Sequence, residues 1–481
     1  MRRSHKEAAQ CAQGWLERAI ERNPNFMQGH FELGVLKEEL GRKDEAIVHY
    51  RRAIELDPDF LPALSNLARL DIQDKQLDVA RKRYESFLSK NPGHAQAYLQ
   101  YAEFMAMTGA QAKDVQAVLE KGLTASPASL PVRLALVRLL VQAGDAKRAL
   151  ALSQEAAVTA PDEPAVLDLL GRSQVAAGEI QQALATYGKL AARVPGSPVP
   201  LIAMADLMVG SKDIAGAEQN LRKALAVKPD SLEAQQRLVA ILLNNKRGDA
   251  AIAIAKDVQR QRKDSAIGYI LEAESLLSVG KRAEAVKLYE EAYKREKSAA
   301  SVLRLHNAHL AANQPQDAAR LAADWIKANP KDLTVRTYLA ERSLAEQKYD
   351  QAVQQYRQMQ EIAPKNPMVL NNLAWALGKL NDKSAVGIAQ QAVALAPNSP
   401  VVLDTLGMLQ IENGEKAKGL ENLRKAVSLG PKLPQLRLSL AKALAANGDK
   451  DGARKELDEA LKNAPEKAPI RNEIDKLRAS L

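Results

Sequence analysis

Residues 394–431 read ALAPNSPVVLDTLGMLQIENGEKAKGLENLRKAVSLGP, and they contain two amphipathic helix patterns separated by a turn. The first pattern places Leu403 and Leu406 on one side of a helix. Gly414 ends that helix, because glycine tolerates the left-handed backbone conformation at a helix terminus. A second pattern covers residues 416–429. The stretch therefore predicts one helix-turn-helix unit that is closed by a proline.

The closing proline recurs along the chain at steps of 33 to 35 residues, apart from one longer gap. The prolines of this series are Pro24, Pro58, Pro92, Pro127, Pro161, Pro195, Pro229, Pro330, Pro364, Pro397, Pro431 and Pro465. The gap from Pro229 to Pro330 equals three periods with two prolines missing. None of the 22 prolines interrupts a predicted helix interior, where proline would cost ~3 kcal/mol. Thirteen such units fit between residues 27 and 465.

Small residues recur at two positions of the unit, when position 1 is the third residue after each proline. Position 8 holds Gly34, Ala68 and Gly407 in three of the units, and position 20 holds Ala80 and Gly419 in two. Small side chains there let two helix backbones approach closely. A period of 34 with these positions resembles the tetratricopeptide repeat. The resemblance implies an all-α solenoid, a right-handed superhelix of about thirteen helix-turn-helix repeats with terminal helices.

The regularity of the repeats divides the chain into five predicted segments. The segments are residues 1–26, the second helix of a truncated repeat or an N-terminal cap; 27–263, a regular array; 264–332, less regular repeats; 333–467, a second regular array; and 468–481, a C-terminal capping helix. A terminal cap is expected because an end repeat otherwise exposes an apolar face.

Composition excludes several functional classes. The net charge is +10, but 58 acidic residues accompany 68 basic ones and aromatic residues make up only 4%, so specific nucleic-acid binding is not predicted. The single cysteine, Cys11, excludes an internal disulfide and a zinc site built from cysteine pairs. No apolar run approaches the ~20 residues of a membrane helix, and no signal peptide is recognised. Catalytic, phosphate-binding and metal-binding motifs are missing, so we predict no enzyme activity and no cofactor.

The family resemblance implies that a partner binds the inner faces of the first helices. Arg69, Arg138 and Arg172 stand at position 9 of the second, fourth and fifth repeats, where they predict a row of guanidinium groups for an acidic peptide or a uronic-type polysaccharide. The alternative is that Glu103 and Asp168 neutralise these arginines in local salt bridges.

A second, less charged contact surface is predicted at Asn371, Asn372 and Trp375. Asn66 and Asn372 also match the central asparagine of the clamp with which some tetratricopeptide proteins hold a chaperone C-terminus. The basic residues that flank this asparagine in the clamp are missing here. A chaperone-tail adaptor is therefore not predicted.

The sequence NNLAWALGKL at residues 371–380, followed by the stretch quoted first, is similar to the tetratricopeptide lipoproteins of PEP-CTERM and exosortase exopolysaccharide systems. The resemblance implies a non-catalytic protein-interaction scaffold in bacterial exopolysaccharide assembly or export, or in envelope protein sorting. It also implies the periplasm or cell envelope, although those proteins carry an N-terminal lipid anchor that this sequence lacks. The alternatives are a cytoplasmic adaptor with a protein partner and an accessory chain of an enzyme.

Overall fold

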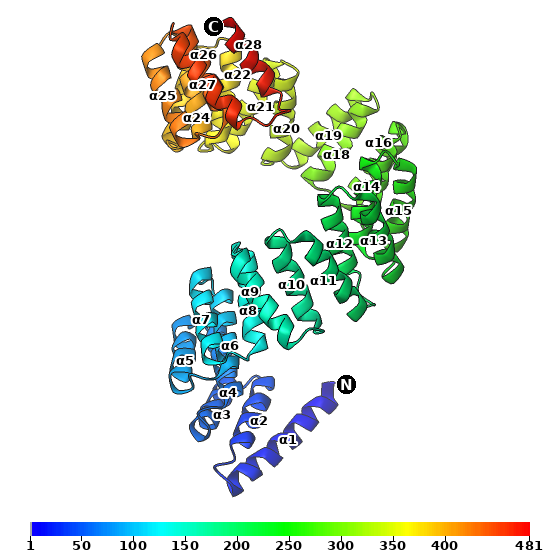
Figure 1. Ribbon diagram of the computed structural model, residues 1–481, viewed down its shortest axis with the longest axis vertical. Helices are drawn as coiled ribbons and strands as arrows, with labels where there is room; N and C mark the ends of the chain where they lie inside the picture. Colours follow the sequence, from blue (N-terminus) through cyan, green and yellow to red (C-terminus); the bar gives the residue numbers. More distant parts are fainter. Residues whose placement is uncertain (1) are drawn as a thin grey trace. The chain divides into compact units, whose positions relative to one another are not determined.

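The chain is all-helical, as predicted. A computed structural model describes the backbone of residues 2–481 and the side chains of residues 11–481, and in this part of the chain there are 28 helices and no strand. Consecutive helices form antiparallel pairs joined by short turns (Figure 1). The prediction of an all-α helix-turn-helix array is therefore confirmed.

Thirteen helix pairs follow α1 (Arg2–Arg22) within residues 2–481 and precede α28 (Ile470–Ser480). The first helices are α2 (Met27–Glu39), α4 (Leu61–Gln73), α6 (Ala95–Met107), α8 (Leu130–Ala143), α10 (Pro164–Ala176), α12 (Val199–Gly210), α14 (Leu232–Asn244), α16 (Ile267–Ser278), α18 (Ala299–Ala311), α20 (Leu333–Ala345), α22 (Pro367–Lys379), α24 (Pro400–Glu412) and α26 (Pro434–Ala446). The second helices are α3 (Lys43–Leu56), α5 (Leu77–Lys90), α7 (Ala112–Ala125), α9 (Ala146–Thr159), α11 (Ile180–Arg193), α13 (Ile214–Val227), α15 (Gly248–Gln261), α17 (Arg282–Arg295), α19 (Pro315–Ala328), α21 (Tyr349–Ile362), α23 (Ala385–Leu395), α25 (Lys416–Leu429) and α27 (Lys450–Asn463).

Internal contacts divide the chain into two compact units, Met1–Ile241 and Leu242–Leu481. The division falls within α14. Both units consist of helix pairs of the same kind. Such an array can extend over many repeats, because each repeat needs contacts only with its neighbours.

The helices of each pair touch where the sequence has small residues. A Cβ atom added to Gly407 in α24 would lie 2.7 Å from Leu423 Cγ and 3.0 Å from the carbonyl oxygen of Gly419 in α25. One added to Gly419 would lie 2.7 Å from the carbonyl oxygen of Gly407. The two backbones are therefore in direct contact. Gly414 makes the turn between them with a φ of 85°, in the left-handed region.

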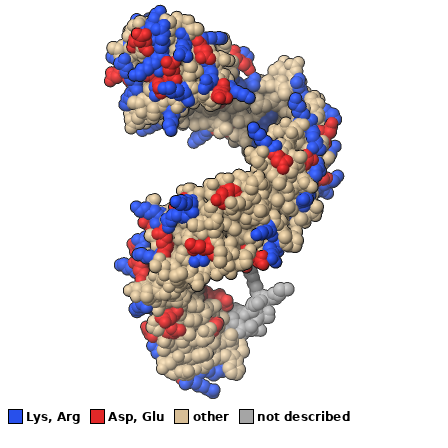
Figure 2. Space-filling model, viewed as in Figure 1, with Lys and Arg blue, Asp and Glu red and all other residues tan. Residues whose placement is uncertain are grey.

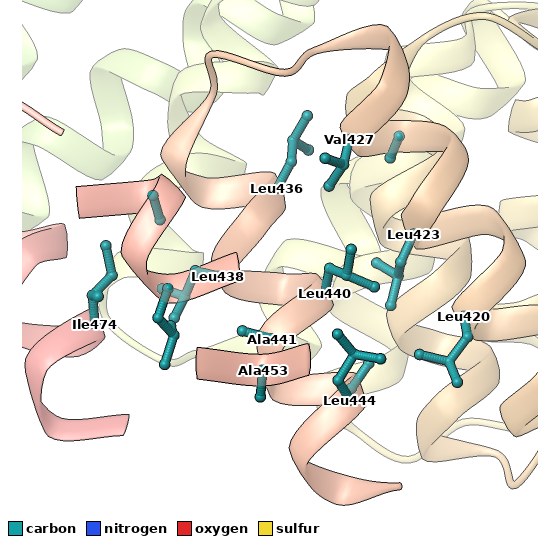
Figure 3. Close-up of a cluster of buried hydrophobic side chains, with 14 of the residues drawn as sticks. Leu420, Leu423, Val427, Leu436, Leu438, Leu440, Ala441, Leu444, Ala453 and Ile474 are labelled. Atoms are coloured by element: carbon teal, nitrogen blue, oxygen red, sulfur yellow. The ribbon is translucent and has the colours of Figure 1, made fainter. Parts of the chain in front are cut away.

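The end of the second unit shows how successive repeats share one core. Leu423, Leu438 and Ile474 have 0% exposure and come from α25, α26 and α28 (Figure 3). Leu457 of α27 is buried to the same extent. Full burial of such a side chain contributes about 1.5 to 3 kcal/mol. The final helix, α28, thus covers the apolar face of the last repeat. It lies in residues 468–481, the segment for which a capping helix is predicted.

At the other end of the chain, α1 packs against α2. Lys37 of α2 is only 4% exposed, and its Nζ lies 3.2 Å from a Glu17 oxygen in α1 and 2.8 Å from a Glu45 oxygen in α3. Burial lowers the pKa of Lys37, but the hydrogen bonds to the two carboxylates outweigh it and the net pKa is raised. The ammonium group therefore stays charged and links α1 to the first repeat.

Candidate partner-binding site

The three arginines predicted to form a row lie on α4, α8 and α10 of the first unit, and all three side chains are exposed. A guanidinium nitrogen of Arg69 lies 2.6 Å from the Glu38 carboxylate of the preceding repeat. Arg172 Nε donates to Asp168 Oδ2 at 2.9 Å, one helical turn away. Arg138 makes no ion pair with any residue that the structure describes. Only Arg138 is therefore unengaged.

Asn66 and Arg69 belong to one polar network between the first two repeats. Tyr50 donates its hydroxyl to Glu38 Oε2 at 3.0 Å, so Glu38 accepts from both Tyr50 and Arg69. Burial and the Glu38 carboxylate raise the pKa of Tyr50, and a hydrogen bond with Asn66 opposes them. The Arg69 partner is thus Glu38 rather than Glu103, and this network holds α2, α3 and α4 together.

The second predicted surface lies on α22 of the second unit, and its three residues differ in exposure. Asn371 is 4% exposed and donates to Asn372 Oδ1 at 3.1 Å, while Asn372 donates to the hydroxyl of Tyr356 at 3.4 Å. Trp375 is 38% exposed. Asn372 therefore links α22 to α21 of the preceding repeat, and Trp375 is the most exposed of the three residues.

Trp375 lines a pocket of about 250 Å³ that is formed by α22, α24 and α26, the first helices of three successive repeats. Besides Trp375, the lining includes Lys379, Asp404, Met408, Ser439 and Lys442. Lys379 Nζ lies 5.1 Å from the centre of the Trp375 ring, and Lys442 Nζ lies 2.6 Å from Glu473 Oε1 of α28.

Asp404 is the unusual group in this pocket. Its Oδ2 accepts a hydrogen bond from Ser439 Oγ at 3.2 Å, but its Oδ1 is buried and has no donor among the described residues. Burial raises the pKa of Asp404 from 3.8 to about 6, although the Ser439 hydrogen bond and the Lys442 charge oppose the shift. A buried acceptor without a donor is costly, so the pocket favours an N–H donor from a partner.

The sequence interpretation did not single out Asp404. It stands at position 5 of its repeat, on the first helix, and an acidic residue there was the available signal. The burial that makes it unusual comes from the neighbouring repeat, through Ser439, which lies 35 residues further along the chain.

The wider surface carries both signs of charge. On the face shown in Figure 2, basic and acidic side chains are interspersed, and neither sign forms a continuous stripe. Within the described part of the chain, no group of three His, Cys, Asp or Glu side chains could hold a metal ion. No helix among the described residues is both long enough and apolar enough for a membrane crossing.

The fold defines a helical-repeat protein. Four family models described as tetratricopeptide repeat match it, at residues 28–60; 66–129, 303–367 and 405–468; 110–172 and 208–273; and 165–197. The chain is therefore a tetratricopeptide-repeat protein. Repeats of this family bind protein partners.

Solved structures that resemble the chain include yeast Tom70, with 15% identity, a TM-score of 0.39 and coverage of 89% of this chain and 96% of that one. Another is the Cut9-Hcn1 hetero-tetramer of the APC/C, with 13% identity, a TM-score of 0.34 and coverage of 87% and 96%. No curated protein sequence matches the chain.

Proposed function

We propose that this chain is a non-catalytic scaffold that binds a protein partner through the first helices of its repeats, with the Asp404 pocket as a principal contact. The observation that carries the proposal is the buried Asp404 Oδ1, which has no donor in the described part of the protein. A carboxylate held in this way opposes folding at neutral pH, and a partner that donates to it would remove the cost.

The pocket suits a lysine or arginine side chain of the partner. Its volume of about 250 Å³ accommodates one long side chain, and Trp375 and Met408 provide an apolar wall for the methylene groups. The cationic head would then reach Asp404. Lys379 Nζ already lies 5.1 Å from the centre of the Trp375 ring, so the partner's cationic head would bind beside this contact and not replace it.

We place this scaffold in bacterial exopolysaccharide assembly or export, or in the sorting of envelope proteins. The support is the similarity of residues 371–380 and of the repeat that follows them to the lipoproteins of those systems. On this proposal, Arg138 and its neighbours Arg69 and Arg172 contact an acidic peptide or a uronic-type polysaccharide. Affinity capture from envelope and cytoplasmic fractions tests the setting, and a partner found only in the cytoplasm would favour the adaptor alternative.

The pocket itself can be tested with a small probe. Nα-acetyl-lysine amide should shift the indole N–H resonance of Trp375 in NMR spectra, while Nα-acetyl-norleucine amide, which lacks the ammonium group, should not. Replacing Asp404 with Asn should weaken the lysine probe about tenfold, since a charged hydrogen bond contributes about 1.5 to 3 kcal/mol. Equal shifts with both probes, or an unchanged affinity in the variant, would show that the pocket does not recognise a cation.

A further inference from the structure

A second cavity, which the proposed function does not use, lies within the second unit between α19 on one side and α20 and α21 on the other. Its volume is about 680 Å³, within the range of small-molecule sites. α19 packs against α20 along a shorter stretch than α17 against α18 or α21 against α22. The cavity exists because the side of α19 that faces it carries small residues, Ala318, Ala319, Ala322 and Ala323.

The opposite wall is polar. Four glutamines of α21 line it at helical spacing, Gln351, Gln354, Gln355 and Gln358. Gln355 Oε1 is buried and has no donor among the described residues. An alanine wall that faces a glutamine wall can hold a ligand with one apolar side and one hydrogen-bonding side.

Arg336 of α20 provides a buried charge at this cavity. It is 7% exposed, its Nη1 donates to Gln358 Oε1 at 2.7 Å, and its Nη2 donates to the Pro330 carbonyl at 3.4 Å. Its Nε is buried without an acceptor, and no described carboxylate lies within 4.0 Å of its guanidinium. A buried cation without a counter-charge is strongly unfavourable.

Two of the three equivalent arginines elsewhere in the described chain have a carboxylate partner. Arg133 and Arg437 stand at the same repeat position, and each donates to the carbonyl of the proline six residues earlier. Arg133 Nη2 lies 3.6 Å from Glu155 Oε2, and Arg437 Nη1 lies 2.5 Å from Glu456 Oε2. A third equivalent, Arg471, donates instead to three backbone carbonyls at the end of α27.

At Arg336, glutamines stand at both places that supply a carboxylate elsewhere. Glu456 follows Arg437 by 19 residues, and Gln355 follows Arg336 by the same 19. Glu155 follows Arg133 by 22 residues, and Gln358 follows Arg336 by the same 22 residues. A neutral amide therefore occupies the place that the carboxylate holds in the fourth repeat. The arginine is retained and is more deeply buried than its equivalents. A cavity of about 500 Å³ also lies between α7 and the fourth repeat, but Arg133 does not line it, whereas Arg336 lines the cavity beside α19.

The other charged groups at the cavity do not neutralise Arg336. Glu346, the one acidic residue of the lining, lies 2.6 Å from Arg342 and 2.7 Å from Lys348. His306 accepts from or donates to the Tyr338 hydroxyl at 2.9 Å. Burial, together with the Arg342 charge, lowers the pKa of His306 to about 4, so this ring is neutral at pH 7. The cavity therefore has an excess of positive charge.

We propose that this cavity binds a carboxylate carried on a short aliphatic chain. The ligand carboxylate pairs with Arg336 as Glu155 pairs with Arg133. The Gln358 side chain turns away to make room for it. The aliphatic part lies against Ala318 and Ala322, and Gln355 supplies a further hydrogen bond. A free monocarboxylic acid and a glutamate side chain of a peptide share this chemistry.

The decisive variant is Gln358→Glu, which supplies the missing carboxylate from within the chain. Hexanoate should bind the wild-type protein and perturb the α20 and α21 resonances, and hexanamide should bind at least about tenfold more weakly because it lacks the charge. Gln358→Glu should weaken hexanoate by at least about tenfold while raising the urea midpoint of the second unit. Gln73→Glu adds the same negative charge at an exposed position of the first unit and serves as the matched control. It should alter neither the hexanoate affinity nor the urea midpoint of the second unit.

A capped pentapeptide with a central glutamate, compared with its glutamine version, distinguishes the two possible carriers of the carboxylate, a peptide and a free monocarboxylic acid. Tighter binding of the glutamate peptide than of hexanoate assigns the site to a protein ligand, and the reverse order assigns it to a small acid. The proposal is overturned if neither probe binds, if hexanoate and hexanamide bind equally, or if Gln358→Glu leaves hexanoate binding unchanged. None of these results depends on the Asp404 pocket.

Discussion

Replacing Asp404 with Asn should stabilise the protein at neutral pH, although most substitutions of buried groups do the opposite. Asp404 is held with one oxygen bonded to Ser439 and the other without a donor, in a place where burial disfavours its charge. Asparagine has nearly the same shape and no charge, and it can still accept the Ser439 hydrogen bond. The variant therefore removes the cost of the buried carboxylate and retains the contact.

The magnitude follows from the pKa of Asp404, which is raised from 3.8 to about 6. Because the folded pKa exceeds the unfolded one, the associated stability is fully present below pH 3.8 and is lost as the pH rises through about 6. Two pKa units correspond to about 3 kcal/mol, an upper value, since the side chain keeps some solvent contact and water screens part of the effect. We expect a gain of about 1 to 3 kcal/mol at pH 7 and almost none at pH 3.5.

Native-state hydrogen exchange of α24 and α26 amides is the suitable assay, because a repeat array opens locally and exchange reports the free energy of opening at these two helices. Protection should rise in the variant at pH 7, and urea titrations at pH 7 and pH 3.5 should show the same contrast. Asp475→Asn, an exposed change on α28 in the same unit, should have little effect at either pH. The reasoning is refuted if Asp404→Asn lowers protection at pH 7, or if its effect is the same at both pH values.

Three further outcomes are expected. Gly407→Ala should destabilise the second unit by about 1 to 3 kcal/mol in urea unfolding. The reason is that the new Cβ would lie 2.7 Å from Leu423 Cγ and 3.0 Å from the Gly419 carbonyl oxygen. An unchanged urea midpoint would contradict the close approach of α24 and α25. Acidification should destabilise the repeats around His306, because its pKa in the folded protein, about 4, lies below the ordinary value of 6.5. The stability that this histidine contributes is present above pH 6.5 and is lost as the pH falls towards 4. Hydrogen exchange that does not change over this pH range would rule the effect out. Arg138→Ala should leave the circular dichroism spectrum unchanged and weaken binding of an acidic partner most strongly at low salt. An equal loss of affinity at about 50 mM and at about 500 mM salt would place that contact elsewhere.

The arginines of the first repeats show how much of the candidate site could be predicted from the sequence. The sequence interpretation placed Arg69, Arg138 and Arg172 on corresponding helices, and the structure has them on α4, α8 and α10. It could not decide which arginines are engaged. Glu38, the partner of Arg69, lies 31 residues earlier in the chain, on the first helix of the preceding repeat. The role of these residues in partner binding stays a prediction.

The sequence by itself determined the helical fold of this protein. A period of 34 residues, the small residues exemplified by Gly407 and Gly419, and a left-handed turn at Gly414 each act within one repeat. Such local rules can be read from the order of residues, because helix formation and close packing within a pair involve neighbours in the chain.

Only the tertiary structure decided which polar groups are unsatisfied. Asp404 is unusual because Ser439 and α26 bury it, and Arg336 is unusual because α19 and α21 leave a cavity beside it and Gln358 replaces a carboxylate there. The physical reason is that the energy of a charge depends on burial and on the nearest counter-charge, and both are set by adjoining repeats rather than by the residues beside it in sequence.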